Sequence, residues 1–184
     1  MIVYNETQES SRGASARLWE AAMGKRSVRK NKNVYQLSRE SRGLTRESAA
    51  EQLVFLSPER IEKIESDKAA PHPDEVLAME SCYQNPELSN YYCTHECPIG
   101  MKYEQEVKLK SLAQITVETL AALNAMEQEK NRLIDISVDG RVNDYEREAF
   151  DQILDKLKAI DRSIRSMQIW LEHAIQTGKI DEAQ

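Results

Sequence analysis

"LTRESAAEQLVFLSPERIEKIESDK", residues 44–68, contains the start signals of two short helices in close succession. Thr45 stands where a side-chain oxygen caps the first helix, and Ser57 followed by Pro58 gives the same signal for the second. The apolar residues then recur at helical spacing: Ala49, Ala50 and Leu53 in the first helix, Ile61 and Ile64 in the second. Helices this short bury their apolar sides only against other helices, so the segment predicts a compact helical domain.

Three more short helices flank this segment. Their sequences are "VYQLSRESRG" (34–43), with Val34, Leu37 and Ser41 on one side, "HPDEVLAMESCY" (72–83) and "PELSNYY" (86–92), the last two separated at Asn85 and Pro86. The chain has few alternating β-branched runs, which argues against a sheet. We therefore expect an all-α protein with a compact five-helix domain over residues 33–100.

Residues 101–184 predict a long antiparallel helical hairpin. One helix carries a heptad seam of Phe150, Ile153, Leu157, Ile160, Ile164, Met167 and Leu171. The preceding helix offers Leu109, Leu112, Leu120, Leu123 and Ile134 as its counterpart. The seam is closed either within the chain or by a second protomer, which would make the protein a homodimer through the hairpin.

Charge is distributed unevenly along the 184 residues. The net charge is −6, yet residues 1–32 form a basic arm with seven basic and three acidic side chains. Within the arm, residues 14–23 predict a short helix with Leu18, Trp19, Ala22 and Met23 on one face. Residues 33–184 therefore carry −10, and affinity for nucleic acid is expected in the arm rather than in the acidic body.

The composition also restricts location and chemistry. The chain has no apolar run near the roughly 18 residues that cross a bilayer, and its N-terminus lacks a secretory signal, so we expect a cytoplasmic protein. Three cysteines, an odd number, fit a reducing compartment. With only three histidines, no Gly-rich phosphate loop and no nucleophile motif, we expect no enzyme.

Residues 44–71 resemble the Cro and CI repressor type of helix-turn-helix found in the XRE family of regulators. The matching positions are Leu44, Thr45, Glu47, Ala49, Ala50, Leu53, Ser57, Ile61, Ile64, Glu65, Lys68 and Pro71. More broadly, residues 34–178 look like a group of helix-turn-helix proteins common on mobile elements of Firmicutes. The resemblance implies a recognition helix that enters the major groove of operator DNA, with Glu59, Arg60, Glu62 and Lys63 nearest the bases.

Two features depart from that family pattern. The turn between Leu53 and Ile61 is one residue longer than usual, and Val54 replaces the customary glycine after the second helix. Residues 58–68 also hold four acidic and three basic side chains, and a helix with that balance meets phosphates poorly.

The arm carries a second resemblance. Tyr4 to Lys30 resembles the N-terminal segment shared by a group of anti-CRISPR proteins encoded on mobile elements of Firmicutes. For that group it implies inhibition of a type II CRISPR effector nuclease, through binding the nuclease and interfering with its guide RNA. The side chains that would bind RNA or nuclease are Arg12, Arg17, Leu18, Trp19, Met23, Lys25, Arg26, Arg29, Lys30 and Lys32. A basic segment with a tryptophan can contact RNA backbone and stack on bases.

Two further patterns concern metals. "DISVDGRVNDYE" places Asp135, Ser137, Asp139, Asn143 and Glu146 at positions 1, 3, 5, 9 and 12 of a twelve-residue calcium loop, with Gly140 at its turn. The alternative is that Gly140 reverses the chain and Asn143 caps the next helix. Cys93 and Cys97 have the spacing of zinc ligands, but a second close pair is missing, which favours thiols packed at a helix junction. We expect no cofactor other than this candidate calcium ion.

The sequence thus leaves two functions of different class. One is an anti-CRISPR inhibitor of a type II RNA-guided nuclease, acting through the arm. The other is an XRE-type DNA-binding regulator of a mobile genetic element, acting through Arg60 and Lys63.

Overall fold

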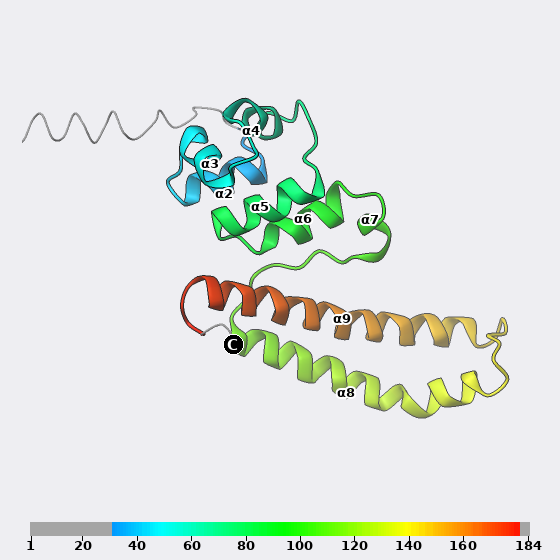
Figure 1. Ribbon diagram of the computed structural model, residues 1–184. Coiled ribbons are helices and arrows are strands. Elements are labelled where there is room, and N and C mark those ends of the chain that lie inside the picture. The colour runs from blue at the N-terminus through cyan, green and yellow to red at the C-terminus, as the bar shows by residue number, and fades with distance from the viewer. Residues whose placement is uncertain (1–30, 181–184) are drawn as a thin grey trace, which may run out of the picture. The chain divides into compact units, whose positions relative to one another are not determined.

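The computed structural model describes residues 31–180, in which every regular element is a helix (Figure 1). The helices are α2 (Val34–Ser41), α3 (Arg46–Leu53), α4 (Pro58–Glu65), α5 (Pro73–Tyr83), α6 (Glu87–His95), α7 (Gly100–Tyr103), α8 (Leu112–Ser137) and α9 (Arg147–Gln176). The predicted all-α class is confirmed. None of the helices within 31–180 combines the length and apolar composition that a bilayer crossing requires.

The chain divides into two compact units, with the boundary between Tyr83 and Gln84. The first unit holds α2 to α5, and the second holds α6 to α9. This boundary differs from the one expected between residues 100 and 101. The reason is that the Asn90 side chain of α6 donates to the Gln105 carbonyl at 3.0 Å and accepts from the Val107 amide at 2.9 Å, which fastens α6 to the segment before α8.

Side-chain caps start the helices of the first unit. Asn33 accepts from the Gln36 amide at 3.0 Å at the start of α2. Thr45 accepts from the Ser48 amide at 3.1 Å while Ser48 Oγ accepts from the Thr45 amide, which is a reciprocal capping box. Ser57 caps α4, with Pro58 at its first position. Both caps predicted from the sequence are confirmed.

The core of the first unit lies where α2, α3, α4 and α5 converge. Its buried apolar side chains are Tyr35, Ala49, Leu53, Leu56, Ile61, Ile64, Val76, Met79 and Tyr83. The predicted inward positions of α3 and α4 are therefore confirmed, except that Ala50 is only half-buried. The predicted side of α2 is wrong, because Leu37 is 53% exposed and the helix buries Tyr35, Gln36, Ser38 and Arg39 instead.

A buried ion pair explains the rotation of α2. Arg39 donates from Nε and Nη2 to the two carboxylate oxygens of Glu65 at 2.5 and 2.9 Å, and from Nη1 to the Leu44 carbonyl. Arg46 adds a contact to Glu65 at 2.8 Å. The Glu65 side chain is 1% exposed, so this network ties α2 and α3 to the end of α4 inside the unit.

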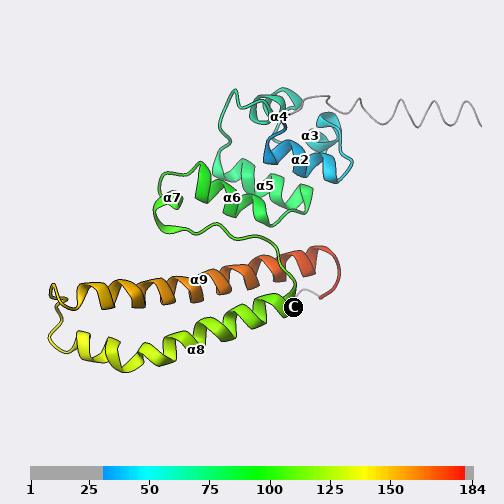
Figure 2. The ribbon, with the colours of Figure 1, turned by 180° about the vertical axis from the view of Figure 1, so that it is seen from behind.

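The second unit is built on the antiparallel pair α8 and α9 (Figure 2). Near the connecting turn, Ile136, Ala149 and Ile153 form a buried cluster against Met126, Leu133 and Phe150. Further along, the buried positions are Ile115 and Ala122 on α8, with Ser163, Ser166, Ile169 and Ala174 on α9. The predicted long hairpin is therefore present between Leu112 and Gln176.

Only part of the predicted seam lies where this hairpin closes, since Ile153 is fully buried and Phe150 packs against its cluster. Of the α9 seam, Leu157, Ile164, Met167 and Leu171 are 39–52% exposed. The proposed α8 counterparts Leu109, Leu112, Leu120, Leu123 and Ile134 are 36–56% exposed. The buried positions of the hairpin combine isoleucines with small residues such as Ala122 and Ser163, and the half-exposed leucines are left to one side.

A strap from Glu104 to Val107 covers another side of α9. Gln105 donates to the Lys158 carbonyl at 3.1 Å, Glu104 pairs with Arg165 at 3.0 Å, and Val107 is 4% exposed. The strap therefore fixes the segment between α7 and α8 onto α9.

The Arg39–Glu65 pair yields the first prediction. Glu65→Leu leaves the buried Arg39 guanidinium without its carboxylate, and should lower the free energy of unfolding by about 3–5 kcal/mol. The double variant Arg39→Met/Glu65→Leu should recover much of that loss. Urea unfolding followed by circular dichroism measures both. The matched control is Glu62→Gln in the exposed Lys68–Glu62 pair, where the change should stay under about 1 kcal/mol. Equal losses in the two pairs would contradict this account.

Candidate nucleic-acid and protein interface

Helix α4 occupies the place of the recognition helix in the expected helix-turn-helix. Glu59, Glu62 and Lys63 are exposed to solvent, as the resemblance requires of base-contacting positions. Arg60 is not, because its side chain is only 24% exposed. The four predicted positions therefore fall into an exposed group of two acids and one base, and one arginine that turns toward the protein.

Arg60 makes a two-pronged ion pair with Glu75 of α5. Its Nε and Nη2 donate to the two Glu75 oxygens at 2.7 and 2.6 Å, and Nη2 also donates to the Ala70 carbonyl at 3.0 Å. The second Glu75 oxygen accepts from the His72 amide at 2.7 Å. Arg60 thus holds the connection between α4 and α5, and its Nε and Nη2 donors are occupied by the protein.

The pKa values of this pair follow from that geometry. Burial acts to raise the pKa of Glu75, but the hydrogen bonds from Arg60 and the His72 amide outweigh it and leave the pKa below its ordinary value of 4.5. The hydrogen bond from Glu75 likewise raises the pKa of Arg60. Both side chains are therefore charged at neutral pH, as a structural ion pair requires.

The exposed surface of α3 and α4 is acidic. Its exposed charged side chains are Glu47, Glu51, Glu59, Glu62, Lys63, Asp67 and Lys68. Lys68 lies 3.7 Å from Glu62, which offsets one of the two positive charges. A surface with five acids and two bases repels phosphates and attracts a basic partner.

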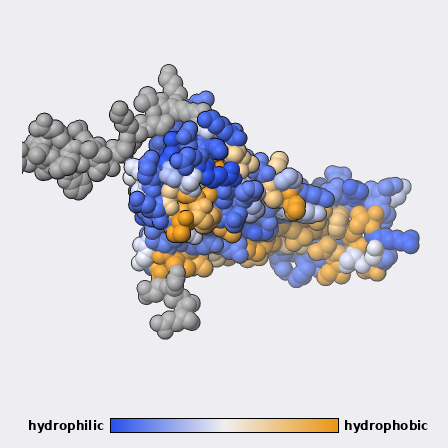
Figure 3. Space-filling model, turned by 45° about the horizontal axis from the view of Figure 1, so that its top comes forward, coloured by the Kyte–Doolittle hydropathy of each residue, from blue (hydrophilic) through white to orange (hydrophobic). Residues whose placement is uncertain are grey.

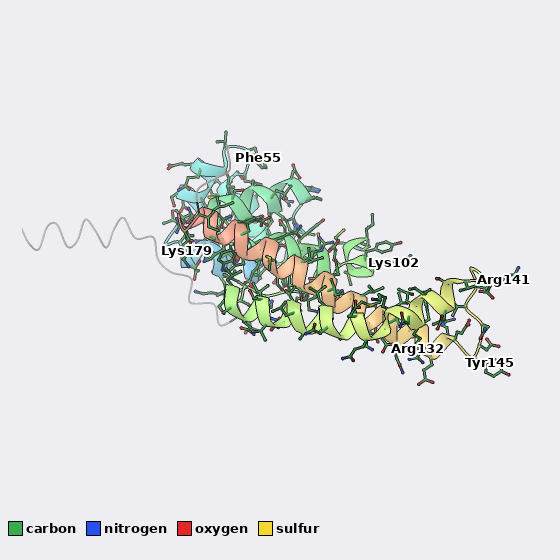
Figure 4. The ribbon with its side chains drawn as sticks, turned by 90° about the horizontal axis from the view of Figure 1, so that it is seen from below. Phe55, Lys102, Arg132, Arg141, Tyr145 and Lys179 are labelled. Atoms are coloured by element: carbon green, nitrogen blue, oxygen red, sulfur yellow. The ribbon has the colours of Figure 1, made fainter. Side chains whose placement is uncertain are left out.

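The turn between α3 and α4 presents two apolar side chains that sequence reasoning did not assign to a site. Val54 is 87% and Phe55 is 60% exposed, and Phe55 lies at the edge of the first unit in Figure 4. The Phe55 amide donates to the Leu53 carbonyl at 2.6 Å across Val54, whose φ is 61° and ψ is −45°. This is a γ-turn of the rare, strained form. The valine at position 54, where the family has a glycine, was the sequence feature that could have indicated this strained turn.

Most of the predicted arm residues lie outside the residues that the structure describes. They are Arg12, Arg17, Leu18, Trp19, Met23, Lys25, Arg26, Arg29 and Lys30. Lys32 is described, and its Nζ pairs with Glu40 at 2.5 Å, where both side chains are largely buried. Lys32 therefore anchors the start of α2 in this structure.

The candidate calcium loop is used to end one helix and start the next. Asp135 and Ser137 still belong to α8, and Asp139 accepts from the Arg141 amide at 2.9 Å. The Asn143 side chain accepts from the Glu146 amide at 3.1 Å, and the Glu146 carboxylate accepts from the Asn143 amide. Asn143 thus caps the turn at residues 143–146 that leads into α9, whereas Glu146, the N-cap residue of α9 itself, makes no side-chain cap hydrogen bond. The alternative in which Asn143 caps the next helix is therefore met only at the turn before it.

Gly140 supplies the reversal, with a φ of 69°. The exposed turn also carries Arg141 and Tyr145, which extend from the tip of the hairpin in Figure 4. Within residues 31–180, the structure brings together no group of three or more His, Cys, Asp or Glu side chains that suits a metal ion. Calcium binding by this turn stays a prediction.

The cysteines are free thiols at helix junctions. Cys82, Cys93 and Cys97 are half-buried. Burial is the main cause that raises the pKa of the Cys93 thiol, and the nearby Cys97 raises it further. The His95 ring stacks on Tyr91 with the ring centroids 4.3 Å apart. Gly100 lies so close to α6 that an added Cβ would sit 2.3 Å from the Cys93 carbonyl oxygen. The structure therefore supports packing of the α6–α7 junction as the role of this region.

Comparisons with known proteins identify no relative. No family model matches the chain, and neither a curated protein nor a solved structure matches it.

The Arg60–Glu75 pair yields a pH prediction. Because the Glu75 pKa is lowered on folding, its contribution to stability is present above the ordinary pKa of 4.5 and is lost as the pH falls through the folded value. Glu75→Gln should therefore cost about 2 kcal/mol in the free energy of unfolding at pH 7 and much less at pH 3. Urea unfolding at the two pH values tests this. A cost that is the same at both would contradict the assignment.

The γ-turn at Val54 yields a prediction of increased stability, in contrast to the loss expected for Glu75→Gln. Val54→Gly removes the strain of a β-branched residue at positive φ and should raise the free energy of unfolding by about 1 kcal/mol. Gly43, with a φ of 69°, is the matched control, and Gly43→Val should lower it by a similar amount. Thermal unfolding measures both changes. A loss of stability in Val54→Gly would show that this turn is unstrained.

Proposed function

We propose that this protein is an anti-CRISPR inhibitor of a type II RNA-guided nuclease. In this proposal it binds the nuclease and interferes with the guide RNA through the basic arm, residues 1–32. The helix-turn-helix-like unit serves as an acidic body that contacts the protein rather than DNA. The proposal rests on the arm's resemblance and on the surface of α4.

The observation that carries the proposal is the withdrawal of Arg60 from the exposed side of α4. A major-groove helix gains its affinity from basic side chains that reach phosphates and bases. Here the arginine is bound to Glu75 at 2.6 Å, and its exposed neighbours Glu59 and Glu62 are acids. Freeing Arg60 for DNA would break the contact that holds α5 to α4.

An acidic body and a basic arm fit a nuclease that holds RNA in a positive channel. Such a channel binds the guide heteroduplex through its backbone charge. The net charge of −10 on residues 33–184 would be drawn toward the channel, while the seven basic side chains of the arm would engage the guide RNA. The exposed Phe55 and Val54 beside α4 add an apolar anchor for a protein partner.

The second candidate function is an XRE-type DNA-binding regulator of a mobile element. It is favoured by the order and capping of α2 to α5, and by the exposure of Lys63. In this case Lys63 would contact operator DNA and the acids of α4 would limit affinity.

A cleavage assay with guide-loaded nuclease separates the two functions. Full-length protein should reduce target cleavage, and Arg17→Glu/Lys25→Glu/Arg26→Glu should weaken that inhibition by ~10-fold or more, because each basic side chain contributes charge-assisted hydrogen bonds to phosphate. Arg141→Glu, a charge reversal at the exposed turn of the hairpin, is the matched control and should leave inhibition unchanged.

Other outcomes would reject the proposal. Undiminished cleavage together with an unchanged level of guide RNA in cells would exclude the inhibitor. A salt-sensitive footprint on the element's promoter, lost in Lys63→Glu and retained in the arm variant, would establish the regulator instead.

A further inference from the structure

The hairpin leaves a long apolar face uncovered. We define the hairpin face as the side chains that are 39–56% exposed on one side of the two helices: Leu112, Leu120, Leu123 and Ile134 of α8, with Leu157, Ile164, Met167 and Leu171 of α9. Figure 3 shows hydrophobic residues along the surface of the hairpin. A face of this kind on a folded protein marks an interaction site more often than an isolated exposed leucine does.

The spacing places these residues in one stripe on each helix. Leu112, Leu123 and Ile134 are eleven residues apart, which is three helical turns, and they share a side of α8. Leu157, Ile164 and Leu171 are seven residues apart and share a side of α9.

The two stripes lie on the same face of the hairpin. Each is rotated in the same sense from small or apolar buried positions of its helix, which are Ile115 and Ala122 on α8, and Ala149, Ser163 and Ala174 on α9. Ile153, eleven residues before Ile164, shares the side of the α9 stripe and is buried near the connecting turn. Because the helices are antiparallel, the same sense of rotation brings both stripes to one side. The strap from Glu104 to Val107 covers a different side of α9, so it leaves this face open.

We propose that the hairpin face binds the same face of a second copy, so that two hairpins form a four-helix bundle. Isologous pairing of one face with itself gives a closed two-fold dimer. The heptad spacing on α9 matches the coiled-coil-like packing of such bundles. This proposal does not depend on the proposed nuclease inhibition.

The length of the face favours a second hairpin over the chain's own arm. Leu112 to Ile134 covers 22 residues of rise, about 33 Å, whereas the ten-residue helix predicted in the arm would span about 15 Å. Two adjacent helices about 10 Å wide make a footprint of roughly 650 Å². Two copies would bury roughly 1,300 Å², which lies in the range of specific, stable interfaces.

The charges on the face permit self-association. Glu127 and Lys130 lie on the same side of α8, between Leu123 and Ile134. They form an ion pair at 2.6 Å within one chain, so they add no net charge to the face. This pair therefore adds no like-charge repulsion between two copies, which a face dominated by one sign would produce.

Sedimentation equilibrium of the full-length protein between 1 and 100 µM tests the proposal. We expect a dimer whose melting temperature rises with concentration. Leu123→Glu and Ile164→Glu should each raise the dimer dissociation constant by ~30-fold or more, as truncation of central interface residues does. Val117→Glu is the matched control, since Val117 is 68% exposed on another side of α8 and should leave the dimer intact.

The result that would overturn the proposal is a monomer at every concentration. If Trp19→Glu converted such a monomer to a dimer, the arm would be what covers the hairpin face in the native chain. That result would also reject the proposal. Circular dichroism measures the helix content of each variant and so shows whether the variant is still folded. Loss of the dimer with retained helix content supports the proposal, whereas a Val117→Glu variant that loses the dimer to the same extent contradicts it.

Discussion

The buried contact between Arg39 and Glu65 sets the geometry of the first unit. A guanidinium and a carboxylate that are both removed from water must stay together, because separating them in a low dielectric is costly. Their distance of 2.5 Å therefore fixes which side of α2 faces inward and where α4 ends. The rotation of α2 leaves Leu37 exposed, and the position of α4 brings Arg60 within reach of Glu75.

The parts of this fold that are local in sequence could be predicted from it. Thr45, Ser57 and Pro58 act within one turn of their own helix, so their residue types were sufficient. Arg60 could not be assigned in this way, because its partner Glu75 lies fifteen residues away and on another helix. An arginine on a recognition-like helix looks the same in sequence whether it meets DNA or a carboxylate. The arm stays an expectation, since it lies outside residues 31–180.

The candidate interface illustrates how packing positions leave function open. Capping and core positions in α2 to α5 agree with the helix-turn-helix pattern, but those positions concern packing. Binding depends on the exposed side chains, and the negative charges of Glu59 and Glu62 on α4 disfavour contact with phosphate. The strained turn at Val54 belongs to the same surface and holds Phe55 in solvent. Together these features favour a protein partner for this side of the unit.

The hairpin shows why a seam read from sequence does not identify its partner. A heptad pattern records that one side of a helix is apolar, and it contains no information about which chain covers that side. Within the chain, α8 and α9 bury Ile136, Ala149 and Ile153 near the turn, and Ile115 and Ala122 further along α8. The larger seam residues, such as Leu157 and Ile164, are then left half-exposed. The seam residues that the intrachain contact leaves half-exposed are better explained by packing between two chains than by packing within one.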